Sequence, residues 1–286
     1  MRASLTFADN KNMAPNTINN TSIGTDKKNT ESAAGLPAAI ILAGGLSTRM
    51  GCCKQLRPLC GKPLIRYVLE TLLEAGLTHL VITVNAETRQ PITAMIETLA
   101  QEKSVQKPPA QNSSLQDAAT EASTSHPFRV FHSFHCDIVF NPEPERGQGH
   151  SAALAVQAAC RKCGEGSASN TAHTYNPSGF LFCTADQPFL QADSIRDLCA
   201  VFQNHPDCIV SAACNGKHRS PVIFPAALAD ELSRLDGNIG GRTVMNAHPD
   251  LILHSPLSSE MEAFDIDTPE DFKRAEEYLN EITASY

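Results

Sequence analysis

The sequence predicts an α/β protein with three layers, α/β/α, around a mainly parallel central sheet. Short apolar runs alternate along the chain with segments of helical periodicity. Several of these runs are continuously apolar, which is typical of parallel strands buried on both faces, and strand–helix alternation is typical of parallel sheets. The 286 residues are 42% hydrophobic, enough to fill one such core.

The predicted strands and helices follow one another in regular order. Residues 38–43 (AAIILA) predict a buried strand that leads into glycines, and Pro63 and Gly76 bracket a predicted helix at 64–75. A strand at 79–85 and a helix at 87–100 continue the alternation. Further strands are expected at 128–140, 179–184, 208–213 and 220–224, and further helices at 150–159, 193–203, 226–235 and 269–280. Asp193 is expected to cap the helix that ends at 203, and Thr268 the helix at 269–280.

The expected organisation is one folded domain with polar additions. Residues 1–36 are rich in Asn, Thr, Ser and Lys, so they are predicted to be a disordered N-terminal tail. Residues 37–286 are predicted to form a single domain, because nothing in them separates two independent cores. Polar, low-complexity segments near 102–127 and 161–178 are predicted to be surface insertions.

Composition excludes some classes of partner. The net charge is −8, and no run of Lys or Arg is longer than two residues, so a nucleic-acid-binding role is not expected. No apolar run approaches the roughly 20 residues of a membrane span, and the N-terminus has no apolar signal core. The sequence therefore predicts a cytoplasmic location with no membrane contact, and the ten cysteines are expected to be reduced.

The glycine-rich segment from Gly44 to Lys54 is the strongest functional signal. Glycines after a buried strand let backbone N–H groups approach an anion, and the segment adds hydroxyls, an arginine and a lysine that suit phosphate oxygens. It matches neither GxxxxGK[ST] nor GxGxxG, which disfavours ordinary kinases and dinucleotide-binding enzymes. The residues predicted to bind nucleotide here are Leu42, Ala43, Gly44, Gly45, Ser47, Thr48, Arg49 and Lys54.

Acidic residues suggest a metal site in the same region. Asp186 directly follows the predicted strand at 179–184, and carboxyl ends of parallel strands are where such sheets bind ligands. Asp265 and Asp267 alternate along the extended segment FDID, so they share a face. Mg²⁺ prefers one or two carboxylates together with phosphate oxygens and water. Asp186 is the first predicted ligand, and either Asp265 or Asp267 can supply the second.

A family resemblance covers these residues. The segment LAGGLSTRMGCCKQLRPLCGKPLI resembles the signature LAxGxSxRMGxxKxLxxLxGKPL of nucleotidyltransferases that activate sugar phosphates, isoprenoid precursors and the molybdenum cofactor. The similarity continues in patches to about residue 275. Within this superfamily the chain is most similar to molybdenum cofactor cytidylyltransferases, on the stretches Lys54-Gln55-Leu56, Gly147–Ser151, Asp186-Gln187-Pro188-Phe189, Ser220-Pro221-Val222 and Asp265–Pro269.

The resemblance implies a Rossmann-like nucleotidyltransferase fold and a Mg²⁺-dependent reaction. A phosphate of the acceptor would attack the α-phosphorus of a nucleoside triphosphate and release pyrophosphate. Arg49, Lys54 and Asp186 would be the catalytic residues, and Ser151 would contact the nucleotide. The implied donor is CTP and the implied acceptor is molybdopterin carrying molybdenum. The implied protein partners are a molybdoenzyme of the xanthine dehydrogenase type or its insertion chaperone.

Two alternatives remain open at the level of sequence. Leu42-Ala43-Gly44-Gly45 is more similar to the guanylyltransferase branch, so GTP is an alternative donor, and a sugar or alcohol phosphate is an alternative acceptor. The second alternative is a protein of the same fold that binds a nucleotide or cofactor without catalysis. Pyrophosphate release would distinguish an enzyme from such a binding protein.

Overall fold

The computed structural model describes residues 35–45, 53–105, 134–160 and 177–284. Nearly all of the predicted N-terminal tail and most of both polar insertions lie outside these residues. The same holds for Ser47, Thr48 and Arg49 of the predicted phosphate segment. The other predicted site residues are all described, namely Leu42, Ala43, Gly44, Gly45, Lys54, Ser151, Asp186, Asp265 and Asp267.

A seven-stranded sheet forms the middle layer of the described chain, in the order β5-β4-β1-β6-β8-β7-β9. Every neighbouring pair is parallel except those of β8, which runs antiparallel to both β6 and β7. The prediction of a mainly parallel sheet is therefore confirmed. The strands are β1 (Ala38–Leu42), β4 (His79–Val84), β5 (His135–Phe140), β6 (Gly179–Thr184), β7 (Ile209–Cys214), β8 (Lys217–Pro225) and β9 (Ile252–Pro256).

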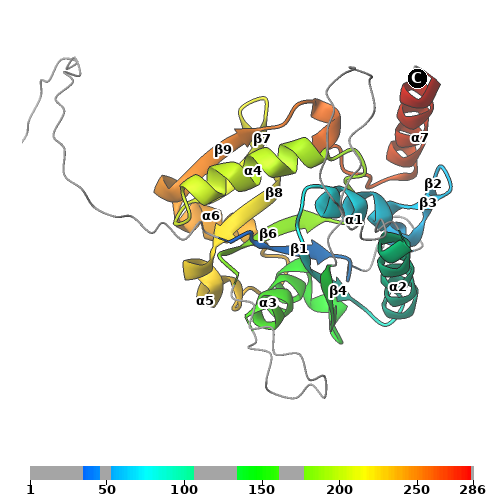
Figure 1. Ribbon diagram of the computed structural model, residues 1–286. Helices are drawn as coiled ribbons and strands as arrows, with labels where there is room; N and C mark the ends of the chain where they lie inside the picture. The colour runs from blue at the N-terminus through cyan, green and yellow to red at the C-terminus, as the bar shows by residue number, and fades with distance from the viewer. Residues whose placement is uncertain (1–34, 46–52, 106–133, 161–176, 285–286) are drawn as a thin grey trace, which may run out of the picture. The chain divides into compact units, whose positions relative to one another are not determined.

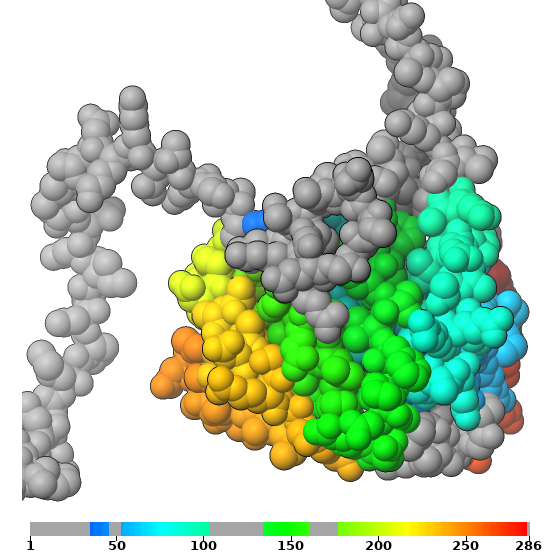
Figure 2. All heavy atoms as spheres, turned by 90° about the horizontal axis from the view of Figure 1, so that it is seen from below, coloured from blue at the N-terminus to red at the C-terminus, as the bar shows by residue number. Residues whose placement is uncertain are grey.

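Helices cover both faces of this sheet, which gives the predicted three layers (Figure 1). One apolar cluster joins the sheet to α1, α2 and α4, and a second joins it to α3, α5 and α6. Figure 2 shows part of the second face, where α3 (green) lies beside the segment that holds α5 (gold). The helices are α1 (Leu64–Glu74), α2 (Arg89–Val105), α3 (Gln148–Ala159), α4 (Ala192–Asn204), α5 (Ala229–Leu232) and α6 (Gly241–Ala247).

A third, smaller cluster forms where the C-terminal helix α7 (Pro269–Ala284) meets the short antiparallel pair β2 (Pro58–Leu59) and β3 (Lys62–Pro63). Phe272 of α7 is buried there, and the Arg57 guanidinium lies 3.9 Å from its ring centroid. The described 3₁₀ turns are η1 (Lys54–Leu56), η2 (Pro144–Arg146), η3 (Ala226–Leu228), η4 (Pro249–Leu251) and η5 (Glu260–Ala263).

The position of β1 between two layers of helices explains why its sequence is continuously apolar. Ala39 and Ile41 belong to the first apolar cluster, whereas Ala38 and Ile40 belong to the second, and all four are fully buried. Successive side chains of a strand point to opposite faces, so a central strand between two helix layers needs apolar residues at every position. The predicted strand at 38–43 is thus confirmed, and burial on both faces is the reason for its apolar sequence.

The antiparallel direction of β8 results from a tight turn. Asn215 and Gly216 connect β7 to β8, and both have positive φ, 52° and 70°. Two positive φ values in a two-residue loop are typical of the type I′ hairpin turn, for which Asn-Gly is a preferred sequence. The two strands were expected from the sequence, and this dipeptide is the signal that also fixes their direction.

Two predicted helix caps have different outcomes. Thr268 caps α7 as predicted, since its hydroxyl accepts from the Asp271 N–H at 3.1 Å. The prediction that Asp193 caps α4 is wrong, because α4 begins at Ala192 with Gln191 as the cap residue and Asp193 lies inside its first turn. The Glu262 carboxylate accepts from the Gln191 N–H at 3.1 Å and so satisfies the backbone donor of the cap residue. None of the helices in the described residues is both long and apolar enough to cross a membrane.

Candidate active site

A pocket of about 380 Å³ lies at the carboxyl ends of β1 and β6. The chain passes from β1 outward to β4 and β5, then returns to β6 on the other side of β1. Such a reversal of strand order opens a crevice at the carboxyl edge of the sheet, where α/β proteins bind ligands. The described residues around the pocket are Leu42, Gly44, Gly45, Lys54, Gln55, Pro144, Glu145, Gly147, Gln148, Ser151, Thr184, Ala185, Asp186 and Asn238.

The pocket brings together most of the described residues that the sequence predicted for the site. Glycines 44 and 45 follow β1, Asp186 follows β6, and Ser151 lies in the first turn of α3. Ala43 is not part of the lining, because its side chain is fully buried and its N–H donates to the Thr83 carbonyl of β4 at 3.2 Å. Ala43 therefore anchors the glycine turn to the sheet.

Lys54 is the electrostatic centre of the pocket. Its ammonium donates to Asp186 Oδ2 at 2.7 Å and to Asp267 Oδ1 at 2.9 Å, and its side chain is only 11% exposed. Burial alone would lower the pKa of this ammonium, but the charge and hydrogen bond of Asp186, and then those of Asp267, raise it above its ordinary value. Lys54 is therefore held in its charged form between two of the carboxylates that the sequence predicted as metal ligands.

Asp186 presents one carboxylate oxygen that the described protein leaves unused. Its Oδ2 accepts from Lys54, whereas Oδ1 is buried and, among the described residues, receives no hydrogen bond. Its backbone carbonyl accepts from the Ile266 N–H at 3.1 Å, which ties the FDID segment to the end of β6. A buried carboxylate oxygen without a donor is costly unless something else satisfies it, and a divalent cation would do so.

The FDID segment places its two acidic side chains differently. Asp267 reaches Lys54, and capping of α7 does not need Asp267, because Thr268 and Asp271 supply that cap. Asp265 lies near the same charges: burial raises its pKa first, the negative charges of Asp186 and Asp267 raise it further, and the result is about 6. Such a group is still mostly ionised at neutral pH. Both residues predicted as alternative metal ligands thus lie near Asp186.

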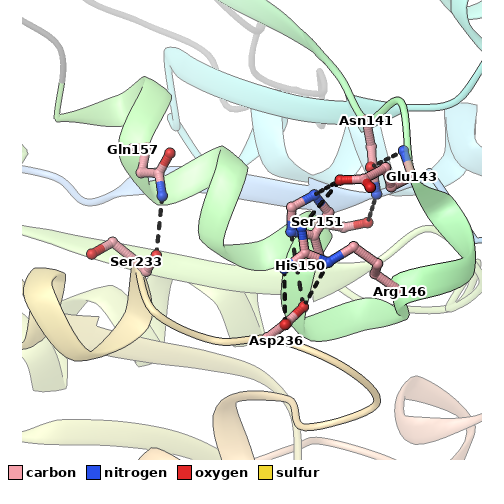
Figure 3. Close-up of polar contacts among 8 residues, drawn as sticks. All are labelled: Asn141, Glu143, Arg146, His150, Ser151, Gln157, Ser233 and Asp236. Atoms are coloured by element: carbon pink, nitrogen blue, oxygen red, sulfur yellow. Dashed lines mark hydrogen bonds and ion pairs between the residues drawn. The ribbon is translucent and has the colours of Figure 1, made fainter.

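Ser151 of α3 lines the other wall of the pocket and is held there by a polar residue that follows β5 (Figure 3). Asn141 follows β5, and its side-chain amide donates to the Ser151 hydroxyl at 2.9 Å. Both side chains are buried, with Asn141 fully covered and Ser151 4% exposed. A Cβ placed on Gly44 would lie 3.5 Å from Ser151 Oγ, so the glycine turn and the first turn of α3 lie side by side. Ser151 accepts from Asn141 and can donate its own proton to a ligand.

The start of α3 is also fixed by the segment after α5. Arg146 donates through two nitrogens to the Asp236 carboxylate, at 3.1 and 2.8 Å, and His150 is turned toward the same aspartate (Figure 3). The Gly149 N–H donates to the Gly237 carbonyl at 2.9 Å. Gly147 has a φ of 95°, and a Cβ there would lie 2.5 Å from Asn238 Oδ1. The glycines that resemble the family pattern are therefore needed for close packing against residues 236–239.

Replacing Gly149 by Ala is expected to destabilise this wall. The new Cβ would lie 2.3 Å from the Ile239 carbonyl oxygen and 2.8 Å from that of Asp236, so backbone must move. Forced overpacking of this kind costs about 1–3 kcal/mol of unfolding free energy. Thermal unfolding measures the loss. Gly240→Ala is the matched control, because its Cβ would meet only Gln148 at 3.9 Å; equal stability of both variants would contradict the prediction.

Two residues that hold the pocket lining in place were not identified from the sequence. Asn85 follows β4 and donates to the Gly44 carbonyl at 3.3 Å, and Asn141 follows β5 and orders Ser151. Both asparagines come directly after an apolar strand, the same position that singled out Asp186. Polar residues at that position of parallel strands converge on one edge of the sheet, so this pattern would have identified them.

Together the described groups suit phosphate chemistry. A glycine turn, a charged lysine and a carboxylate with an unused oxygen line one pocket together with the Ser151 hydroxyl, and two buried asparagines outside the lining hydrogen-bond to Gly44 and Ser151. Positive charge and a bound cation stabilise charge that develops on transferring phosphoryl groups.

Known proteins resemble this chain in sequence and in fold. "Purine catabolism protein PucB" of Bacillus subtilis is 24% identical over 237 residues, which cover 82% of this chain and 92% of PucB. The crystal structure of Rv0371c from Mycobacterium tuberculosis has a TM-score of 0.58 at 18% identity, covering 85% of this chain and 98% of that one. A nucleotidyl transferase from Methanothermobacter thermautotroptrophicus has a TM-score of 0.57 at 16% identity, covering 87% and 100%.

At these identities the two solved structures show that the fold is shared. The family comparison goes further, because residues 39–251 match the MobA-like NTP transferase domain. This range starts in β1 and reaches η4, so it includes the glycine turn, Lys54 and Asp186. Since the match covers well over half of the chain, the protein belongs to the family of MobA-like NTP transferase domains.

Proposed function

We propose that the protein transfers CMP from CTP to the terminal phosphate of molybdopterin that carries molybdenum, with Mg²⁺ bound at Asp186. The main support for a metal-dependent transfer is the buried Asp186 Oδ1. This oxygen has no hydrogen-bond donor among the described residues, and its carboxylate pairs with the charged Lys54. The acceptor phosphate is already a nucleophile, so no general base is needed. What the site must supply is positioning and charge stabilisation.

The carboxylates fit Mg²⁺ better than a softer ion. Asp186, Asp265 and Asp267 offer oxygen ligands only, and Mg²⁺ is bound in proteins by one or two carboxylates plus phosphate oxygens and water. When bound, the ion would neutralise the triphosphate and the leaving pyrophosphate. Lys54 would contribute its positive charge to the same phosphates, and Ser151, oriented by Asn141, would contact the nucleoside end.

Two residues in the site support cytidylyl over guanylyl transfer. The guanylyltransferase branch usually has Ala after the lysine and Met after the aspartate, where this chain has Gln55 and Gln187. Gln55 is 6% exposed and lines the pocket, and Gln187 is 1% exposed and bonds to Asp265. Gln55 therefore lies in the pocket, and Gln187 lies beside a carboxylate of the FDID segment. The name of the Bacillus relative also fits a cofactor for hydroxylases of the xanthine dehydrogenase type, because xanthine is a purine.

Thermal unfolding with Mg²⁺ and single triphosphates tests the donor. A ligand at 100 times its Kd stabilises by about 2.7 kcal/mol, which for a domain of this size raises Tm by roughly 5–10 °C. CTP is expected to give this shift, and GTP and UTP a clearly smaller one. Stabilisation by GTP alone would show that the base assignment is wrong and would favour the guanylyl alternative.

Pyrophosphate release with molybdopterin tests the reaction itself. Release with CTP is expected to depend on the acceptor. If no triphosphate gives pyrophosphate with molybdopterin or with any sugar or alcohol phosphate, while CTP still stabilises the fold, the protein is a binding module and not an enzyme. If release requires a sugar or alcohol phosphate instead, the transfer stands and the acceptor assignment fails.

A further inference from the structure

A group of side chains of the kinds that bind metal ions lies at the amino ends of the strands, on the side of the sheet opposite the carboxyl ends where the pocket lies. His79 is the first residue of β4, and His135 is the first residue of β5, its parallel neighbour. The two are direct register partners, and Asp137 lies two residues further along β5 on the same face. The pocket lies at carboxyl ends of strands, whereas this histidine cluster (His79, His135 and Asp137) lies at amino ends.

The three side chains converge closely. His79 Nε2 lies 3.0 Å from Asp137 Oδ2, and His135 Nε2 lies 3.0 Å from Asp137 Oδ1, so one carboxylate joins both rings. The ring centroids are 5.2 Å apart. One ligand atom from each residue lies within 4.8 Å of the other two, and in the described chain no other set of three His, Cys, Asp or Glu residues meets this condition.

The chemistry of the three groups is that of a transition-metal site. Proteins bind Zn²⁺ through imidazole nitrogens at about 2.0–2.1 Å and carboxylate oxygens at about 2.0–2.2 Å, so neighbouring ligand atoms of a tetrahedral site lie about 3.4 Å apart. The two nitrogen–oxygen separations of 3.0 Å, each to a different Asp137 oxygen, are close to this value, and the ligand atoms lie within 4.8 Å of one another, so side-chain rotation is needed to bring both nitrogens and one oxygen to a single ion. Mg²⁺ and Ca²⁺ prefer oxygen ligands and are poor matches to two imidazoles.

Burial and charge prepare the cluster for a cation. The His79 side chain is 8% exposed and that of Asp137 38%, while the His135 side chain is 63% exposed and leaves one side of the cluster open to solvent. Burial raises the pKa of Asp137, but the His79 hydrogen bond and the His135 charge outweigh it and lower the pKa below its ordinary value. An aspartate carboxylate is ionised at neutral pH at its ordinary pKa, as a metal ligand must be.

The neighbouring cysteine does not take part. Cys136 alternates to the other face of β5 and packs against the first apolar cluster. The ligand set is therefore two nitrogens and one carboxylate, without sulfur.

We propose that His79, His135 and Asp137 bind a divalent transition-metal ion, with Zn²⁺ as the best match, at a site separate from the nucleotide pocket. Each ring must offer an Nε2 lone pair, so it shifts the Nε2 proton to Nδ1 or, when cationic, releases one proton to solvent. Water completes the coordination on the open side. β5 is an edge strand of the sheet, and the ion would tie its first residues to β4.

Cobalt is a spectroscopic substitute for zinc and provides the test. The full-length protein is titrated with Co²⁺ in excess Mg²⁺, so that the pocket carboxylates are already occupied. The expected result is one equivalent of Co²⁺ with visible absorption and no sulfur-to-metal charge transfer, which Zn²⁺ then displaces. His135→Gln, which changes a largely exposed side chain, should weaken Co²⁺ binding at least about tenfold.

Two further variants make the result decisive. Asp137→Asn should weaken binding in the same way, and His248→Gln should not, because among the described residues His248 pairs with only one carboxylate, that of Glu231 at 2.9 Å. Equal Co²⁺ binding by the wild type and His135→Gln, thiolate bands in the spectrum, or no stoichiometric binding would each overturn the proposal. Pyrophosphate release in Mg²⁺ should be unchanged in His135→Gln, so failure of the metal site and failure of the proposed reaction are distinguishable.

Discussion

Replacing Asp186 by Asn is expected to reduce pyrophosphate release by at least about 100-fold while the protein stays folded. The amide keeps the size of the side chain and can still accept from Lys54 through its oxygen. It removes the negative charge, and with it the ability of the buried Oδ1 position to bind a cation strongly. The measurement is a pyrophosphate-release assay at saturating triphosphate and Mg²⁺, with thermal unfolding as the check on folding.

A matched change far from the pocket controls for loss of one surface charge. Asp207→Asn alters an exposed aspartate in the turn before β7, at the amino end of that strand, and should keep full activity. If Asp186→Asn also retained wild-type turnover, Asp186 would not be a metal ligand in the reaction. Loss of activity together with loss of the folded state would move the test to Asp186→Glu, whose carboxylate keeps the charge in a shifted position.

The sequence predicted the central strands well because a strand buried on two faces has a continuous run of apolar residues. Residues 179–184 were expected as a strand, and β6 has these bounds. β9 was not expected, since it lies at the sheet edge and its residues are only partly apolar (ILHSP). α6 has seven residues, too few for its apolar periodicity to stand out.

The sequence predicted those site residues whose location follows from their place directly after a strand. Asp186 and the glycine turn follow strands directly, so their convergence needed only the rule that parallel strands end at one edge. The pairing of Lys54 with Asp186 and Asp267 was not predictable, because it joins residues 132 and 213 positions apart. A sequence indicates that a lysine lies in a phosphate-binding segment, but it does not show which carboxylates form ion pairs with that lysine.

Replacing Lys54 by Met is expected to separate catalysis from cation binding. The ammonium lies between Asp186 and Asp267, where a divalent cation must also gain its carboxylate ligands. Removing it takes away a competing positive charge, so Mg²⁺ affinity should rise; a change of about 1.4 kcal/mol corresponds to a tenfold rise. Pyrophosphate release should nevertheless fall by about 100-fold or more, because the charge that stabilises the transferring phosphate is lost.

Stability in the absence of Mg²⁺ provides the second measurement. Without Lys54, three carboxylates remain close together, and Asp265 already has a raised pKa from burial and from the charges of Asp186 and Asp267. The Lys54→Met protein should therefore unfold at a lower temperature than the wild type, and Mg²⁺ should restore more of its stability than it adds to the wild type. Thermal unfolding at increasing Mg²⁺ concentrations measures this difference.

A second lysine–carboxylate pair distinguishes this explanation from a general loss of charge. Lys62 donates to Glu70 at 2.9 Å and lies outside the described pocket lining, with a side chain 34% exposed. Lys62→Met should leave Mg²⁺ affinity and pyrophosphate release unchanged. If Mg²⁺ stabilised the wild type and Lys54→Met equally, the ammonium would not compete with the cation. Lys54 would then contribute to phosphate binding alone, and the cation would have to bind Asp186 from the side of the unused Oδ1.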